Sequence, residues 1–241
     1  RQVTLPRHWD QFSFSPRGDG LAFLSLGLEE STRWLATSAP DGSNTRPVEP
    51  LGDNANKVQV AWSPNDAIIA FSRTGQPQAL NETEIYLVGQ HGENFRSLVV
   101  NGLNFRGQWS PDGRTILYSV TSGDEDFKPL LWTVSGSPDA IGQAKRPLSL
   151  NTWAEKCAFA SATVAYCAVP QTLERGAGLY PAVANTIPDD LYRVDLVSGA
   201  TNRVAIPADN HTINSLVISP DESALYFTDQ SSGQLYKINL K

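Results

Sequence analysis

The chain has 241 residues, of which 40% are hydrophobic, and this length can bury a substantial core as one domain. Its formal net charge of −6, without a basic stripe that carries interleaved aromatic residues, argues against nucleic-acid binding. No apolar run approaches the roughly 20 residues that a membrane-spanning helix needs, so membrane insertion is not expected. The chain contains no methionine, which we interpret as typical of a processed chain or of a domain cut from a longer protein.

A hairpin with a Ser-Pro-Asp-Gly turn recurs along the chain. Its clearest copy, WSPDGRTILYS at 109–119, reads as a strand, a tight turn and a second strand rich in β-branched and aromatic residues. The turn prolines fall at positions 16, 64, 111 and 220, in nearly equal steps except for a last interval about twice as long. CAFASATVAYC at 157–167 fills that interval, with the turn shortened by two residues. The sequence therefore predicts five repeated units.

Each unit continues with a third strand. In four of the five units, a short fourth segment follows whose first residue is arginine. The third strands are RWLATS, EIYLVG, LLWTVSG, LYRVDLVSG and LYKINLK, and the fourth segments begin at Arg46, Arg96, Arg146 and Arg203. The fifth unit has no such segment before Lys241, whereas RQVTLP at 1–6 has the same form. We predict an all-β, five-bladed β-propeller of four-stranded antiparallel blades, closed by the N-terminal strand pairing with Leu235–Leu240 in the C-terminal blade.

The expected domain organisation follows from these units. We expect one domain over 1–241, with blades at about 7–52, 53–101, 102–150, 151–207, and 208–241 plus 1–6.

The Ser-Pro-Asp-Gly turn, together with third strands of the LYRVDLVSG type, resembles the TolB-like (WD-repeat-like) β-propeller repeats of bacterial envelope proteins. The resemblance covers nearly the whole chain. It implies the propeller fold, and it implies a function among those of such repeats, which serve as protein-binding platforms, as sensors and as domains appended to hydrolases. Propellers of this family commonly have six blades, so the five units predicted here depart from the usual pattern.

The two cysteines, Cys157 and Cys167, flank the shortened hairpin of the fourth unit. In the third unit we expect their places to be taken by Gly107 and Ser119, which should face each other across the hairpin. A cross-strand disulfide is the favoured interpretation, and two free buried thiols are the alternative. A zinc site is not expected, because none of the three histidines is near the cysteines in sequence. A disulfide would place the protein outside the cytoplasm, as a periplasmic, cell-surface or secreted protein.

The lengths of the loops indicate which face of the predicted propeller would bind a partner or ligand. The connections between second and third strands are long and irregular, above all Ala168 to Asp190 (AVPQTLERGAGLYPAVANTIPDD). Because strand direction alternates, these loops emerge on the same face as the links that lead into each new blade. The links bring polar and aromatic residues there, and the candidate binding residues are Trp9, Asp10, Phe105, Trp153, Glu155 and His211. The alternative is that the aromatic rings cap the core of each blade.

A five-bladed propeller can also be a glycoside hydrolase, which needs a pair of carboxylates at the central channel. Asp10 and Glu155 stand six residues before the turn proline, or its equivalent, where we expect the innermost strands. The pair lacks the third carboxylate and the surrounding motif that such enzymes use. No nucleophile elbow is present, and no metal or cofactor is expected.

Two charged stretches have simple structural interpretations. RGD at 17–19 occupies the place of the Pro-Asp-Gly turn, so turn chemistry explains it better than cell adhesion does. The acidic run GDEDF at 123–127 matches no calcium-binding loop and is expected to be a solvated loop.

The sequence thus favours a non-enzymatic binding or scaffold propeller outside the cytoplasm. A protein partner of the cell envelope or of an extracellular assembly is expected, and a glycan is the second choice.

Overall fold

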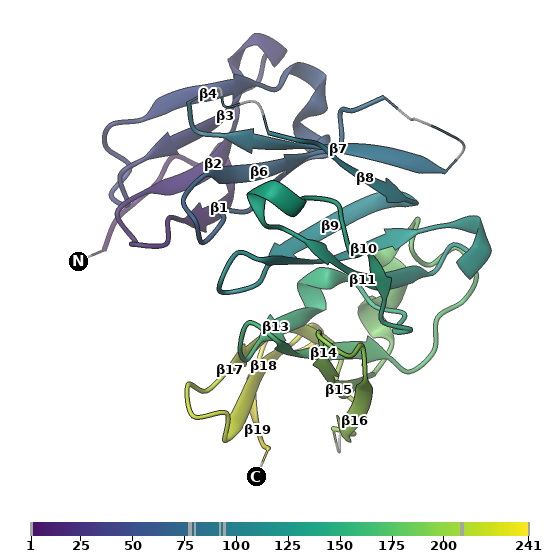
Figure 1. Ribbon diagram of the computed structural model, residues 1–241. Coiled ribbons are helices and arrows are strands. Elements are labelled where there is room, and N and C mark those ends of the chain that lie inside the picture. The colour runs from purple at the N-terminus through teal and green to yellow at the C-terminus, as the bar shows by residue number, and fades with distance from the viewer. Residues whose placement is uncertain are drawn as a thin grey trace. The chain divides into compact units, whose positions relative to one another are not determined.

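The computed structural model describes residues 2–76, 79, 81–91, 93, 95–207 and 210–240. Arg1, Asp209 and Lys241, which belong to predicted segments, lie outside the described residues. The chain is all-β, with five antiparallel sheets that follow one another along the sequence (Figure 1). Within each sheet the strands lie in sequence order, so every connection joins neighbouring antiparallel strands. This architecture of consecutive antiparallel meanders, four with four strands and one with three among the described residues, is that of a β-propeller.

The strands of each sheet are as follows. The first sheet has β1 (Trp9–Phe14), β2 (Leu21–Leu26), β3 (Arg33–Ser38) and β4 (Arg46–Pro50), and the second has β5 (Val58–Val60), β6 (Ile68–Ser72), β7 (Glu82–Gly89) and β8 (Leu98–Asn101). The third has β9 (Leu103–Trp109), β10 (Thr115–Thr121), β11 (Pro129–Ser135) and β12 (Arg146–Pro147). The fourth has β13 (Cys157–Phe159), β14 (Val164–Pro170), β15 (Asp189–Asp195) and β16 (Thr201–Ala205), and the fifth has β17 (Ile213–Ile218), β18 (Ala224–Asp229) and β19 (Leu235–Asn239).

Short 3-10 turns connect some of these strands. They are η1 (Glu30–Thr32), η2 (Gly52–Lys57), η3 (Gly123–Glu125), η4 (Pro138–Ala140), η5 (Ala154–Lys156) and η6 (Pro181–Thr186). In the described part of the chain, no helix is long and apolar enough to cross a membrane.

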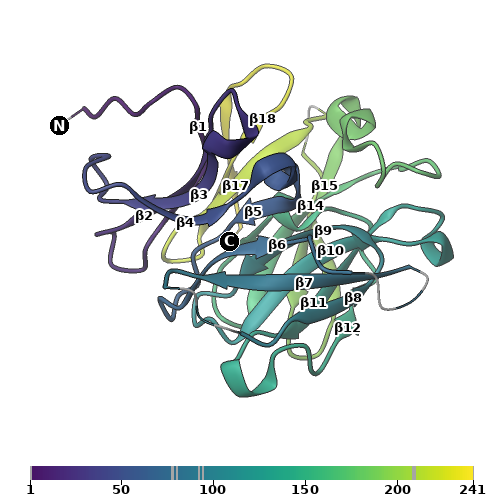
Figure 2. The same ribbon diagram turned by 90° about the horizontal axis from the view of Figure 1, so that it is seen from above.

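The described residues form two compact units. Unit 1 comprises 1–100 with 137–141, and unit 2 comprises 101–136 with 142–241. The placement of the two units relative to one another is not determined, so one domain and a closed ring stay predictions. Within unit 1, residues 2–6 form no strand and lead into β1 as an extended trace (Figure 2), and Leu5 packs against the buried cluster of Leu21, Phe23 and Ala36. The sheet of β17 to β19 has three strands among the described residues.

Hydrogen bonds within the turn explain why Ser-Pro-Asp-Gly recurs. In the third blade, the hydroxyl of Ser110 donates to Asp112 Oδ1 at 2.6 Å and accepts the backbone N–H of Thr115 at 2.9 Å. Asp112 also accepts the backbone N–H of Arg114 at 3.1 Å, so two side chains satisfy the donors that the turn exposes. The same serine-to-aspartate hydrogen bond, at 2.6 Å, joins Ser219 to Asp221 in the fifth blade.

Apolar side chains of neighbouring blades meet in the cores of each unit. In unit 1, a cluster includes Leu24 and Leu35 of the first blade with Val58 and Ile69 of the second. In unit 2, one cluster joins the third and fourth blades and another joins the fourth and fifth. Blades that are neighbours within a unit therefore cover one another's faces, and an isolated hairpin lacks such cover.

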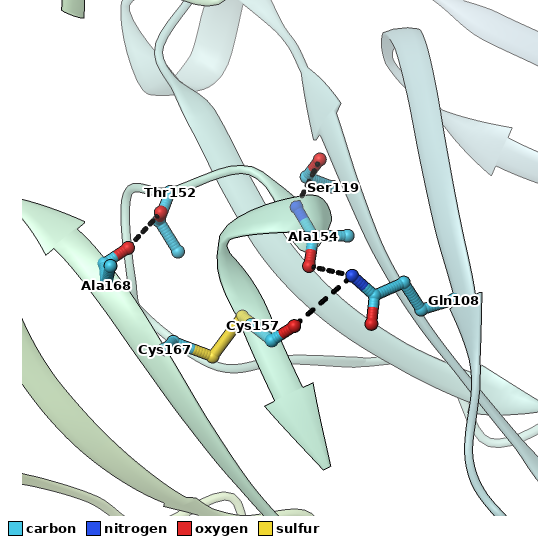
Figure 3. Close-up of a disulfide and its surroundings, with 7 residues drawn as sticks. All are labelled: Gln108, Ser119, Thr152, Ala154, Cys157, Cys167 and Ala168. Atoms are coloured by element: carbon cyan, nitrogen blue, oxygen red, sulfur yellow. Dashed lines mark hydrogen bonds between the residues drawn. A yellow bond between two sulfur atoms is a disulfide. The ribbon is translucent and has the colours of Figure 1, made fainter. Parts of the chain in front are cut away.

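The hairpin of the fourth blade carries the predicted disulfide. Cys157 and Cys167 are directly opposite each other on β13 and β14, with Cα atoms 4.0 Å apart, and their sulfur atoms are bonded (Figure 3). This prediction is confirmed, but the equivalence with the third blade was wrong. Gly107 faces Tyr118 rather than Ser119. The fourth hairpin is one residue shorter than the third, not two, so the paired positions shift by one.

Candidate binding site

Trp9 and Asp10 lie on β1 of unit 1. The ring of Trp9 stacks on Phe23 with centroids 3.7 Å apart and remains half-buried. Asp10 is exposed, and its carboxylate accepts the backbone N–H of Gln11 at 2.9 Å. Trp9 thus both caps a small core cluster and presents part of its ring to solvent.

Phe105 and Trp153 are not the exposed anchors that the sequence predicted. Phe105 is 1% exposed and Trp153 is 4% exposed. Phe105 stacks on Tyr118, with ring centroids 5.5 Å apart. Burial raises the pKa of the Tyr118 hydroxyl well above its usual range. For these two rings the alternative interpretation holds, since large aromatic side chains gain most free energy where blades pack together.

Glu155 occupies a different position from the predicted one. It lies on η5, before β13, and not on an innermost strand. Its carboxylate forms an ion pair with the guanidinium of Arg106 on β9, and both side chains are partly exposed. Asp10 belongs to unit 1 and Glu155 to unit 2, so their predicted pairing stays a prediction.

Two side chains of the third blade, Gln108 and Ser119, hold η5 in place through backbone groups of Ala154 and Cys157 (Figure 3). The amide of Gln108 on β9 donates to the carbonyl oxygens of Ala154, at 2.7 Å, and Cys157, at 3.3 Å. The backbone N–H of Ala154 donates to the hydroxyl of Ser119 at 3.1 Å. In the same link, Thr152 donates to the carbonyl of Ala168 at 2.6 Å. The third blade therefore fixes the link that carries Glu155 and Trp153.

A buried ion pair also anchors this link, and sequence reasoning missed it. Lys156 Nζ lies 2.7 Å from both carboxylate oxygens of Asp189, the first residue of β15. Asp189 also accepts the backbone N–H of Ile213 at 2.7 Å. Burial raises the pKa of Asp189, while the attraction to Lys156 acts in the opposite direction. A lysine beside a cysteine in a short link carries no sequence signal for such a role.

The long loop predicted at Ala168 to Asp190 is shorter than expected, because β14 extends to Pro170 and β15 begins at Asp189. The remaining loop, 171–188, is held at both of its flanks. On one flank, Gly176 N and Gly178 N donate to the carbonyls of Asp126 and Phe127, at 2.8 and 2.9 Å. On the other flank, the hydroxyl of Thr212 donates to the carbonyl of Ile187 at 2.9 Å.

The acidic segment 123–127 is thus a docking partner for the loop as well as a charged surface. Asp126 and Phe127 both adopt left-handed backbone conformations, with φ of 54°. This bend turns their carbonyls toward the loop, and it is a conformation that non-glycine residues adopt at a cost. A Cβ at Gly178 would lie 2.9 Å from the carbonyl oxygen of Phe127, so the close approach requires glycine.

His211 lies where the sequence expected it, on the link before β17, but is largely covered. Its Nδ1 is 3.2 Å from Asp229 Oδ2, and its ring lies 4.0 Å from the Tyr236 ring, between centroids. Its side chain is 12% exposed. His211 therefore contributes to the packing beside the site more than to its surface.

A polar cavity of about 140 Å³ lies in unit 2 between these elements. Trp153 and Glu155 of the candidate set line it, with residues from β9, the long loop, the last link and the turn after β18. The lining residues are Arg106, Trp153, Glu155, Lys156, Pro181, Ala184, Asn185, Thr212, Ile213, Asn214 and Gln230. Its three charged side chains are all paired, Arg106 with Glu155 in the lining and Lys156 with the buried Asp189 behind it. The cavity therefore offers amides and a buried indole to a neutral polar group.

The loop beside the cavity presents an apolar surface. Leu179, Tyr180 and Val183 are exposed by 37%, 71% and 50%, although they flank or belong to η6, which lines the cavity. We call these three residues the loop patch. Apolar side chains held in an ordered loop at the rim of a cavity are typical of protein contact surfaces.

Other predicted features have structural roles. In the RGD segment, Arg17 forms ion pairs with Asp19 and with Asp66 of the next blade, at 3.1 and 3.3 Å. The hydroxyl of Ser15 donates a hydrogen bond to the carboxylate of Asp19, and this hydrogen bond lowers the pKa of Asp19. Among the described residues, no three side chains of His, Cys, Asp or Glu lie together as a metal site would require.

Comparisons with known proteins define the class of fold. Tricorn protease aligns with 96% of this chain at 9% identity and a TM-score of 0.56. The β-propeller domain of the trilobed protease from Pyrococcus furiosus aligns with 95% at 11% identity and a TM-score of 0.58. The acylaminoacyl peptidase of Pyrococcus horikoshii aligns with 97% at 15% identity and a TM-score of 0.61. The chain is similar to these proteins in its β-propeller fold.

The chain spans only part of these proteins, namely 25%, 67% and 38% of their respective lengths. No protein-family model matches the sequence. No curated protein matches it either. The TolB-like family therefore stays a resemblance, while the propeller fold is supported.

Proposed function

We propose that this chain is a non-enzymatic binding module that engages a protein partner through the long-loop face of unit 2. The observation that carries the proposal is the loop patch, Leu179, Tyr180 and Val183, on a loop that backbone hydrogen bonds hold in place. A fixed loop loses little conformational entropy when a partner binds, so its exposed apolar side chains add to affinity. Tyrosine is among the residues most often found at the energetic centre of interfaces.

The cavity gives this face its polar part. Its amides and its balanced charges suit a neutral polar side chain or backbone group of the partner beside the apolar contact. An apolar centre with a polar surround is the usual composition of a specific interface.

The disulfide supports a location outside the cytoplasm, because disulfides persist in oxidising compartments. A partner in the cell envelope or in an extracellular assembly is consistent with this location and with the TolB-like resemblance. A glycan is the second choice of ligand, since a polar cavity beside an indole ring also suits sugar hydroxyls.

The test is capture of partners from the envelope fraction of the source organism, followed by measurement of affinity for the captured protein. We expect Tyr180→Ser and Val183→Ser each to weaken binding by a factor of about 30, the scale of about 2 kcal/mol for an interface anchor. Val197→Ser is the matched control, because Val197 is 66% exposed on unit 2 outside the long loop. Equal binding by all variants would refute the loop face.

The hydrolase alternative requires a separate experiment. If Asp10 and Glu155 were the acid/base pair of a glycoside hydrolase, the intact chain would hydrolyse members of a glycan panel. Asp10→Asn with Glu155→Gln would then eliminate turnover, whereas the binding proposal expects this double variant still to capture the partner, because it leaves the loop patch unchanged. Turnover that disappears in the double variant would overturn the proposed function.

A further inference from the structure

A second cavity, of about 410 Å³, lies within unit 1. It opens between the outer strands of the first blade and the third strand of the second blade. The lining residues are Leu35, Val48, Glu49, Leu51, Val58, Ser72, Thr74, Tyr86, Leu87, Val88, Gly89, Glu93 and Phe95. Its volume falls within the range of pockets that hold small organic molecules.

The inner wall of the cavity is apolar. Leu35, Leu51, Val58 and Leu87 are buried, and the first three belong to the core cluster that joins the two blades. Part of this apolar core therefore borders the cavity and is not covered by other side chains there. Apolar surface around such an opening gains free energy when an apolar group covers it.

The charges of the cavity are of one sign. Among the described residues that line it, Glu49 and Glu93 are the only carboxylic acids, and there is no lysine or arginine. Burial acts to raise the pKa of Glu93, but the hydrogen bonds from His91 outweigh it and lower the pKa, so Glu93 is ionised at neutral pH. The backbone N–H of His91 donates to Glu93 Oε2 at 2.8 Å, and its ring Nδ1 lies 3.1 Å from Oε1.

Gly89, at the end of β7, shapes the wall that carries Glu93. A Cβ there would lie 2.7 Å from the ring of Phe95, so the missing side chain lets Phe95 lie directly on the strand. The carboxylate of Glu93 lies over the same glycine. An aromatic ring and a carboxylate are thus held side by side at the cavity, where a ligand can contact both.

We infer that this cavity binds a small organic cation, namely an aromatic or aliphatic group that carries one ammonium or similar positive group. The apolar part lies against Leu35, Leu51 and Val58, and the positive group lies near Glu93 and Glu49. Phe95 and Tyr86 add aromatic faces, which attract cations further. A neutral or anionic relative of the same ligand lacks the charge contact, and the anion is repelled by both carboxylates.

The test uses three probes with the same indole ring, which are tryptamine, tryptophol and indole-3-propionate. Methyl NMR of the protein at pH 8, where an ordinary histidine is neutral, follows the signals of Leu51, Val58 and Val88. We expect saturable shifts with tryptamine and a dissociation constant of about 1 mM, the scale for a ligand of this size. Tryptophol should bind about threefold to fivefold more weakly, and indole-3-propionate more weakly still.

Variants of the protein separate recognition of the ligand's charge from non-specific hydrophobic binding. Glu93→Gln should weaken tryptamine binding by about threefold to fivefold and leave tryptophol unchanged. Glu29→Gln is the matched control, because Glu29 is exposed in unit 1 and does not line the cavity. An unchanged melting temperature shows that each variant is folded.

Three outcomes would overturn the inference. Equal affinity for all three probes would mean that the charge of the ligand is not recognised. No saturable shift with tryptamine up to about tenfold above the expected constant would mean that the cavity binds no such molecule. Binding of acetyl-Lys-Trp-amide with much higher affinity than tryptamine would assign the cavity to a peptide segment instead of a small organic cation.

Discussion

Lys156 Nζ lies 2.7 Å from both carboxylate oxygens of Asp189, and this pair joins the link before the fourth blade to the third strand of that blade. The Asp189 side chain has no exposed surface, and the Lys156 side chain is 10% exposed. Because Asp189 also accepts the backbone N–H of Ile213, three segments of unit 2 meet at one carboxylate. Lys156 and Ile213, which both line the polar cavity, are thus tied to each other through this carboxylate.

Removing the lysine should destabilise the protein strongly. In Lys156→Met the carboxylate of Asp189 loses its partner while it stays buried, so we expect the free energy of unfolding at pH 7 to fall by about 3–5 kcal/mol. Urea denaturation measures this change. Arg106→Gln is the control, since the pair of Arg106 with Glu155 is partly exposed and is expected to contribute about 1 kcal/mol or less.

The pH dependence of Lys156→Met gives a second readout. Burial raises the pKa of Asp189 above its unfolded value, so the folded state binds the proton more readily than the unfolded state does. Without the lysine this effect should grow, and the deficit of the variant relative to the wild type should shrink as the pH falls from 7 toward about 4. A deficit that is the same at both pH values would contradict an ionised, uncompensated Asp189.

The disulfide should be fully formed and should contribute to stability. Thiol titration of the unfolded, unreduced protein should detect almost no free thiol, because Cys157 and Cys167 are bonded. Cys157→Ser with Cys167→Ser should lower the free energy of unfolding by about 2–3 kcal/mol, the scale for a short closed loop. Two reactive thiols per chain would refute the bridge and remove the main support for a location outside the cytoplasm.

Acid should weaken the turns between first and second strands. Hydrogen bonds from Ser219 and Ser223 lower the pKa of Asp221, and at Asp112 the hydrogen bonds from Ser110 and Arg114 outweigh burial and lower the pKa as well. These two ionised carboxylates therefore contribute their full stabilisation above pH about 3.9, which is the pKa of aspartate in the unfolded chain. The stabilisation is lost as the pH falls through the lower pKa of the folded state.

Asp112→Asn tests this sign. Asparagine can accept the same hydrogen bond, as Asn65 does from Ser63 at 2.6 Å in the second blade, but it does not titrate. We expect the variant to fold and to lose less stability than the wild type between about pH 5 and pH 2. Urea denaturation across this range measures the difference, with Glu29→Gln as the control. A steeper loss in Asp112→Asn would show that the sign is wrong.

Deletion of residues 1–6 tests the predicted ring closure. If this segment pairs with β19, its removal should lower the melting temperature and increase hydrogen exchange at the amides of residues 235–239. Leu5→Ser is the control, because it removes only the packing of Leu5 on the cluster of Leu21, Phe23 and Ala36 and keeps the backbone. If the deletion leaves exchange at 235–239 as it is in the full chain, the N-terminal segment does not close the ring.

The repeated strands and turns were predictable from the sequence because their determinants are local. RWLATS coincides with β3, Arg33–Ser38, and the predicted fourth segment and β4 both begin at Arg46. Alternating side chains and the Ser-Pro-Asp-Gly turn act over a few residues, so one chain segment is enough to recognise them. Cys157 and Cys167 were predictable for the same reason, since two strands of one hairpin face each other.

The candidate site was only partly predictable, because burial and contacts between distant segments decide it. Trp153 is a residue type that often anchors a partner at a surface. In this structure Gln108 and Ser119 hold the link that carries Trp153 against the third blade, and the Trp153 side chain is buried. The loop 171–188 has the composition of a mobile segment, yet carbonyls of Asp126 and Phe127, far away in sequence, hold it in place. Sequence pattern determined which segments form strands, whereas tertiary packing decided which polar and aromatic side chains remain open to a ligand, because burial depends on what covers a residue and not on the residue alone.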